Sequence, residues 1–169
     1  MFLLYIRMSK RECVRFSAQT RKGRRCKKTT CMYSTYCNVH TKQLFQLYLK
    51  PSSIPRSGTG LYTSKIIPAN TRIAKYTGTI KPQGGTPTGY DVAIPRGRVI
   101  DASSTQAGIA RYANDCRAQN KRDGQCSGNN SKFSVSTRNG VTSVWLVSTK
   151  RIAAGSEIMV SYGRSYWRS

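Results

Sequence analysis

The chain has 169 residues, enough for one medium-sized domain with a small appendage. It carries 29 Lys and Arg residues against 6 Asp and Glu, a formal net charge of +23. Its 38% of hydrophobic residues can form a core, which excludes a fully disordered chain. A run of about 18 apolar residues is absent from the sequence, which excludes a transmembrane helix.

The charge excess favours a polyanionic partner such as DNA, RNA or a nucleosome. The alternative is a charge that serves only solubility. The apolar stretch at residues 1–6 is too short for the hydrophobic region of a secretion signal. It also has no basic residue before it and no small-residue cleavage site after it. We therefore expect an intracellular protein.

Residues 1–50 form a basic segment with 12 Lys or Arg and one acid, Glu12. Residues 44–49 predict one or two helical turns at its end. Residues 51–55, with the sequence Pro-Ser-Ser-Ile-Pro, are typical of a linker. We therefore divide the chain into a small module at 1–50 and a larger domain at 51–169.

The small module contains a metal-like cluster, Cys13-x12-Cys26-x4-Cys31-x5-Cys37-x2-His40. Zinc prefers four Cys or His ligands in a tetrahedron, and Cys37 with His40 could supply two of them from one turn. Cys13 and Cys26 complete the predicted set, with Cys31 as an alternative. So small and basic a segment can hardly build an apolar core alone, so a structural zinc would stabilise it. The alternative is a set of free thiols in a loose arm.

In residues 51–169, short β-rich runs alternate with turn residues, which predicts an α+β domain that is mostly β. The predicted strands lie at 61–63, 71–76, 90–94, 99–100, 133–136, 144–147 and 157–162. Asn139-Gly140 indicates a hairpin between two of them. The only helical stretch predicted here is 103–112. Cys116 and Cys126 are expected to be unrelated thiols, because nothing indicates a secreted disulfide framework.

The strongest signal in this domain is an ordered series of motifs. In chain order they are Gly58-Thr59-Gly60-Leu61-Tyr62, Ile73-Ala74-Lys75-Tyr76-Thr77-Gly78, Tyr90, Ile100-Asp101-Ala102, Ala110-Arg111-Tyr112-Ala113-Asn114-Asp115-Cys116, Gly155-Ser156-Glu157-Ile158 and Ser161-Tyr162-Gly163-Arg164-Ser165-Tyr166-Trp167. Each motif alone is weak, but the ordered set resembles the SET domain, the fold of most protein lysine methyltransferases. It looks most like the short viral members, which also end just after a Tyr-Gly-x-x-Tyr-Trp segment.

The resemblance implies small curved sheets around a pseudoknot, S-adenosylmethionine as cofactor and a lysine side chain as acceptor. Cofactor and lysine would enter from opposite faces and meet in a narrow channel. Many chromosomal members complete this channel with a Cys-rich tail. This sequence has none after Trp167, so Tyr166, Trp167 or a dimer partner would close the site.

Site roles follow from the resemblance, position by position. Tyr162 and Tyr90 would be the catalytic tyrosine and a wall of the lysine channel. Val160 and Tyr166 would also line that channel. The predicted cofactor contacts are Gly58, Gly60, Leu61, Arg111, Tyr112, Asn114 and Trp167. Structural alternatives stand beside these roles: a plain hairpin turn for the glycines, a buried amide for Asn114, a strand aromatic for Tyr90 and core packing for Trp167.

The chemistry requires a neutral amine, because only an unprotonated lysine can attack the methyl group. A dry aromatic channel beside a cationic sulfonium lowers the pKa of that lysine, so no strong general base is needed. The domain has no histidine, which argues against a Ser-His-Asp hydrolase and a catalytic metal centre. Asp115 stands where many members have histidine. The small Val160 leaves room for di- or trimethylation.

The leading hypothesis is therefore a lysine methyltransferase, viral in origin, acting on a histone or a DNA-packaging protein. A protein of this charge repels an isolated basic tail but is attracted to nucleosomal DNA. The basic module at 1–50 would be the docking arm, and the location would be a host nucleus or a virion. The alternative is a non-catalytic DNA- or chromatin-binding protein on a SET-like scaffold. Methylation of a non-histone protein is a third reading.

Overall fold

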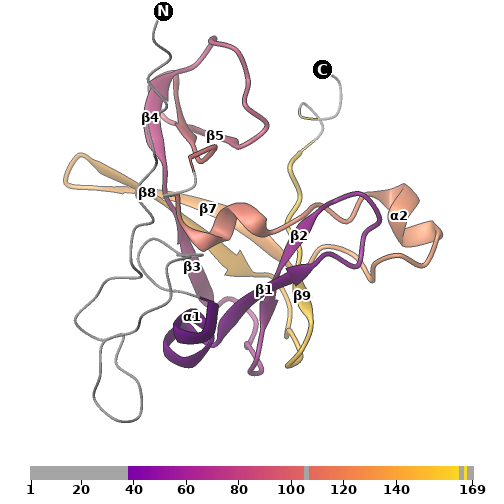
Figure 1. The fold of residues 1–169 in the computed structure, drawn as a ribbon. Coiled ribbons are helices and arrows are strands. Elements are labelled where there is room, and N and C mark those ends of the chain that lie inside the picture. The colour runs from indigo at the N-terminus through magenta and orange to yellow at the C-terminus, as the bar shows by residue number, and fades with distance from the viewer. Residues whose placement is uncertain (1–37, 105–106, 164–165, 167–169) are drawn as a thin grey trace, which may run out of the picture.

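The computed structural model describes residues 38–104, 107–163 and 166, and Figure 1 shows their elements. In chain order these are α1 (Asn38–Phe45), β1 (Leu47–Pro51), β2 (Thr59–Thr63), β3 (Arg72–Tyr76), β4 (Thr79–Pro82), β5 (Asp91–Ile94), β6 (Arg98–Asp101), the 3-10 helix η1 (Ile109–Tyr112), α2 (Ala118–Arg122), β7 (Ser131–Arg138), β8 (Val141–Ser148) and β9 (Glu157–Ile158). None of the helices in these ranges could span a membrane.

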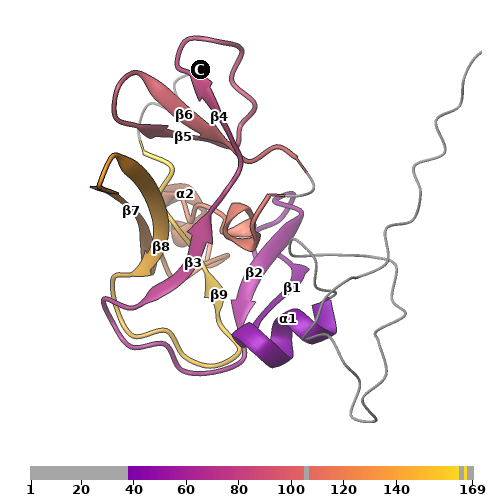
Figure 2. The same ribbon diagram turned by 90° about the vertical axis from the view of Figure 1, so that its left-hand side faces the viewer.

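The strands form three small antiparallel sheets, which Figure 2 shows around the centre of the molecule. Their orders are β1-β2-β9, β3-β8-β7 and β4-β6-β5. The short helices lie between the sheets and at their edges. This architecture confirms the mostly β fold of small sheets that the sequence predicts.

The core follows the alternation of side chains along the strands. In β8, Val144 and Leu146 are completely buried, whereas Trp145 between them lies on the opposite face and is partly exposed. The β7–β8 hairpin turns at Asn139 and Gly140, whose φ angles are 48° and 74°. Positive φ at both central residues is what this type of two-residue turn requires, so the predicted hairpin is confirmed.

Residues 44–49 do not form the predicted helical end. Helix α1 ends at Phe45, and strand β1 begins two residues later at Leu47. Leu47 and Leu49 are buried, and β1 pairs along its whole length with β2. Burial of these two leucines against the sheet therefore outweighs the local helical pattern, and β1 crosses the domain boundary predicted at residue 50.

The Pro-Ser-Ser-Ile-Pro segment is not a linker. Pro51 is the last residue of β1, and the side chains of Ser52 and Ser53 donate hydrogen bonds to the buried carboxylate of Glu157. Ile54 is buried against Met159. The segment is tied to the core because its polar atoms have partners that lie about a hundred residues away.

The helix prediction for 103–112 is also wrong in extent, since among the described residues of this range only those of η1 are helical. The predicted strand 157–162 shortens to β9. Strand β4 and helix α2 have no counterpart among the predicted elements. Ile80 in β4 is 54% exposed, so this strand carries no buried apolar pattern that the sequence could show.

After β9, the chain runs between two earlier segments. Met159 forms a parallel bridge with Asn114, and Val160 forms one with Ser131. The Asn130 side chain binds the backbone on both sides of Ile158: Nδ2 donates to the Glu157 carbonyl, and Oδ1 accepts the Met159 N–H. This insertion of the C-terminal segment is the arrangement that the predicted pseudoknot requires.

Cys116 and Cys126 are joined by a disulfide, so the expectation of two unrelated thiols is wrong. The bond closes the loop that contains α2, and both cysteines pack in a cluster with Ile54 and Met159. The ten-residue spacing alone did not predict the pair, because a disulfide requires the two Cα atoms to lie within about 7 Å. The turn through α2 brings them to 6.0 Å.

Replacing Cys126 with Ser is expected to lower the free energy of unfolding by about 2–3 kcal/mol, because the unfolded chain loses a loop constraint. Thermal unfolding with and without a dithiol reductant measures the effect. The wild type should lose this stability on reduction, whereas Cys126→Ser should not respond to the reductant. Identical melting of both proteins under both conditions would contradict the structural role of the bond.

Candidate active site

The site is built around the carboxylate of Glu157, which is 7% exposed. Its Oε1 accepts hydrogen bonds from Ser52 Oγ at 2.7 Å and from Asn114 Nδ2 at 3.2 Å. Its Oε2 accepts from Ser53 N and Oγ, at 2.9 and 2.7 Å, and from the Tyr62 hydroxyl at 2.9 Å. One side chain therefore joins the β1–β2 loop, strand β2 and the motif around Asn114.

Burial raises the pKa of Glu157, but the hydrogen bonds from Ser53, Ser52 and Asn114 outweigh it and hold the pKa below its ordinary value of 4.5. The carboxylate is therefore ionised at neutral pH. Burial, followed by the bond to this carboxylate, raises the pKa of Tyr62 to about 12. The pair is thus a neutral phenol that donates to a charged acceptor.

Glycine occupies the two predicted cofactor positions, 58 and 60, for different structural reasons. A Cβ on Gly60 would lie 2.2 Å from Glu157 Oε1, so glycine is required there by the buried carboxylate itself. Gly58 has a φ of 66°, and a Cβ there would meet open space. The backbone at Gly58 is therefore accessible to a ligand. Leu61, another predicted contact, is completely buried in β2, so its side chain is a core residue.

Asn114 has both the structural and the ligand-facing features that the sequence left as alternatives. Its Nδ2 donates to Glu157 Oε1 and, at 3.2 Å, to the Thr59 carbonyl. Within the described part of the chain, its Oδ1 accepts no hydrogen bond, and the residue is only partly buried. An amide oxygen beside the Gly58 turn is thus available to a ligand.

Four tyrosines gather beside the segment that contains Ala113 and Asn114. The Tyr162 hydroxyl donates to the Ala113 carbonyl at 3.0 Å, and its ring packs edge to face with Tyr166, with centroids 4.7 Å apart. The Tyr166 hydroxyl lies 3.4 Å from the Gly89 carbonyl, next to Tyr90. The structure therefore brings together Tyr90, Tyr162 and Tyr166, which the resemblance had assigned to the lysine channel. Val160 follows β9 and is completely buried.

Tyr76 completes this group and was not predicted as a site residue. Its buried hydroxyl donates to the Tyr90 carbonyl at 2.7 Å, which also accepts the Ala102 N–H. Burial, followed by the neighbouring Tyr162, raises the pKa of Tyr76. Burial, followed by Tyr166, likewise raises that of Tyr162. Both phenols therefore stay neutral over the physiological pH range.

Arg111, a predicted cofactor contact, stacks on two tyrosine rings. Its guanidinium sits 4.2 Å from the centroid of the Tyr90 ring and 5.3 Å from that of Tyr112, and Nη1 donates to the Ser104 carbonyl. The guanidinium is thus stacked on the Tyr90 ring of the candidate lysine channel. A cation in this position disfavours a second positive charge on an incoming amine.

Asp115 stands at the position where many SET domains have histidine, and here it has a structural function. Its Oδ2 accepts the Tyr162 N–H at 2.9 Å, and its Oδ1 accepts Asn129 Nδ2 at the same distance. Asp115, Tyr76 and Glu157 were thus missed as residues that build the site. All three stand in the motifs of the ordered series, but their contacts with distant segments could not be read from those motifs.

Some predicted residues lie outside the described part of the chain. They are Trp167 and the candidate zinc ligands Cys13, Cys26, Cys31 and Cys37. His40 lies in α1, but its side chain is not described. Among the described residues there is no group of three or more metal-ligating side chains. The zinc-stapled module therefore stays a prediction.

The model of the SET domain family matches residues 58–163, which is more than half of the chain. The chain belongs to the SET-domain family. The match covers the Gly58 turn, the Asn114 segment, Glu157 and Tyr162. Ser52, Ser53 and Tyr166 of the site lie outside it. A comparison with curated proteins finds no match.

The SET fold is also found in solved structures. A structure of KRYPTONITE in complex with mCHH DNA, an H3(1-15) peptide and SAH superposes with a TM-score of 0.54 at 20% identity. A second KRYPTONITE structure, with mCHG DNA and SAH, gives the same TM-score and identity. They cover 70% and 71% of this chain, which spans only about a quarter of theirs, 23% and 24%. At this identity the likeness concerns the fold.

Replacing Glu157 with Gln is expected to lower the free energy of unfolding at pH 7 by about 1–3 kcal/mol, because charge-assisted bonds to a buried group are lost. The pKa of Glu157 is lowered by folding, so its contribution is complete above the unfolded value of 4.5 and is lost as pH falls below it. Denaturant unfolding from pH 7 to pH 3 should therefore show the two proteins converging in acid. A constant difference across this range would contradict the assignment.

Proposed function

We propose that this SET domain transfers a methyl group from S-adenosylmethionine to a lysine side chain of a histone or another DNA-packaging protein. The observation that carries the proposal is the cluster of Tyr76, Tyr90, Tyr162 and Tyr166 beside the Asn114 segment. It offers an aromatic wall with neutral hydroxyls and buried backbone carbonyls. These are the groups that position an amine for displacement at a methyl carbon.

The Gly58 turn and the Asn114 side chain fit the cofactor. The Gly58 turn has open space where a Cβ would lie, and Asn114 Oδ1 is available as an acceptor for an amino group such as that of adenine. Glu157 fixes the orientation of the Asn114 amide by accepting from its Nδ2. When bound, S-adenosylmethionine supplies the electrophilic methyl group. Trp167 would add a flat apolar surface against the adenine.

The tyrosine cluster favours a neutral lysine. Aromatic walls desolvate an ammonium group, and the Arg111 guanidinium over Tyr90 adds a like charge, so both lower the pKa of an entering lysine. The Tyr162 hydroxyl donates to the Ala113 carbonyl, and a phenol oxygen can also accept an amine N–H and so orient the nitrogen. A separate general base is therefore unnecessary.

The net charge of +23 supports a substrate that sits on DNA rather than a free basic tail. Both KRYPTONITE structures contain DNA and one also contains an H3(1-15) peptide, which agrees with this class of partner. A viral origin, a docking function for residues 1–50, a structural zinc and a dimer remain parts of the proposal. So does a location in a host nucleus or a virion.

Replacing Tyr162 with Phe is expected to reduce methyl transfer by about 100-fold or more, because an oriented polar contact to the reacting group is lost. The assay measures label from S-adenosylmethionine on nucleosomes, free histones and other basic proteins. Tyr48→Phe is the matched control, since Tyr48 packs on Tyr62 away from the channel and should keep wild-type activity. Wild-type protein that labels none of these acceptors but binds DNA would favour the non-catalytic alternative.

Replacing Val160 with Phe is expected to shift the products from di- and trimethyllysine to monomethyllysine. Val160 is completely buried two residues before Tyr162, so a larger side chain there takes up space that additional methyl groups need. Mass spectrometry of the product peptide gives the distribution, and Val160→Ala serves as the small counterpart. An unchanged distribution in a folded Val160→Phe protein would show that this position does not limit the product.

A further inference from the structure

The β3-β8-β7 sheet has one buried face and one face that no described element covers. Along these strands the residues that alternate with the buried ones form what we call the outer face. It carries Arg72 and Lys75 on β3, Lys132 and Arg138 on β7, and Trp145 on β8. The remaining outer positions on β7 and β8 are Ser or Val. Cross-strand pairing supports this grouping, since Trp145 pairs with Lys75.

All charges on the outer face are positive. Arg72, Lys75, Lys132 and Arg138 are exposed, and among the described residues none of them forms an ion pair with a carboxylate. The described acids lie elsewhere, four of them close to the site or on the β4-β6-β5 sheet. Like charges brought together on one sheet destabilise it unless an anion compensates them.

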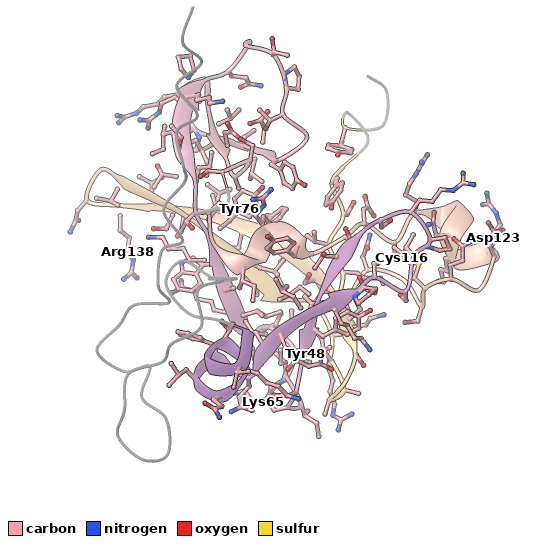
Figure 3. All side chains as sticks on the ribbon, in the orientation of Figure 1. Tyr48, Lys65, Tyr76, Cys116, Asp123 and Arg138 are labelled. Carbon is pink, nitrogen blue, oxygen red and sulfur yellow. A yellow bond between two sulfur atoms is a disulfide. The ribbon has the colours of Figure 1, made fainter. Side chains whose placement is uncertain are left out.

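The dimensions of the outer face suit an extended polyanion. From Lys132 to Arg138, β7 runs for about 20 Å, and three strands span about 10 Å across. Figure 1 shows the β7–β8 hairpin reaching away from the rest of the fold, and Figure 3 shows Arg138 at its end. The cations can therefore approach a long, rigid partner without obstruction from the other sheets.

We propose that the outer face of the β3-β8-β7 sheet binds the phosphate backbone of duplex DNA. Single-stranded nucleic acids are bound mainly through aromatic rings on which their bases stack. The only aromatic ring of the outer face is Trp145, and the Arg72 guanidinium lies 5.4 Å from its centroid. The ring is therefore partly covered, and the face offers charge rather than a stacking platform. This favours the regular backbone of a duplex.

The test is binding of the full-length protein to a labelled duplex of about 20 base pairs at salt concentrations from about 50 to 200 mM. Lys75→Gln/Lys132→Gln removes two exposed cations without touching the core. The slope of log affinity against log salt should become less steep by about 1.8, so the loss of affinity over this range should be about tenfold smaller. The change should be the same for unrelated DNA sequences, because phosphates carry no sequence information.

Lys65→Gln/Lys121→Gln is the charge-matched control, since both lysines are exposed and lie off this sheet. Figure 3 shows Lys65 well apart from Arg138. The control should keep the wild-type slope. Equal changes in the two double variants, or no change in Lys75→Gln/Lys132→Gln, would overturn the proposal.

Arg138→Gln at the hairpin tip is a single substitution that cannot disturb packing, and it should reduce the slope by about 0.9. An unchanged slope would count against the proposal. A single-stranded DNA of the same length is measured beside the duplex. Tighter binding of the single strand, lost through the same substitutions, would overturn the assignment to duplex DNA. No cofactor or acceptor is present in these measurements, so their outcome is independent of methyl transfer.

Discussion

The buried carboxylate of Glu157 is the interaction on which the rest of the site depends. A charge that is 7% exposed is costly unless donors surround it, and here Ser52, Ser53, Tyr62 and Asn114 supply them. These donors come from segments about 40 to 105 residues away along the chain. Satisfying one charge therefore sets the path of the β1–β2 loop and the orientation of the Asn114 amide. It also explains why position 60 must be glycine.

The second constraint is the C-terminal segment that follows β9. Asn130 accepts the Met159 N–H and donates its own N–H to the Met159 carbonyl, and Asp115 accepts the Tyr162 N–H. These contacts place the Tyr162 hydroxyl against the Ala113 carbonyl, one residue before Asn114. The ligand-facing amide and the candidate catalytic phenol thus come from two neighbouring segments in direct contact. Small shifts in either segment would change the distance between the two halves of the site.

The charges of the molecule are divided between its parts. Most of the described acids bind partners within the fold. Glu157 accepts hydrogen bonds from hydroxyls, and Asp101 pairs with Lys81 and accepts a hydrogen bond from Thr88. The phenols of the tyrosine cluster remain neutral because burial raises the pKa of Tyr76 and Tyr162. Positive charge is left to accumulate on exposed surfaces, including the outer face of the β3-β8-β7 sheet. A cationic exterior can therefore coexist with a site that accepts a lysine as a neutral amine.

The sequence by itself indicated the family, through the order of its motifs along the chain. It also predicted most strands and the hairpin at Asn139, because these depend on residue types within a few positions of one another. It also predicted Asn114 and Tyr162, since each stands in a short motif with a fixed order along the chain. Only the tertiary structure decided that residues 47–49 form a strand, that Cys116 and Cys126 pair, and that Tyr76 joins the site. Those features depend on contacts between segments that are distant in the sequence and are brought together by folding. Local sequence patterns do not predict such contacts.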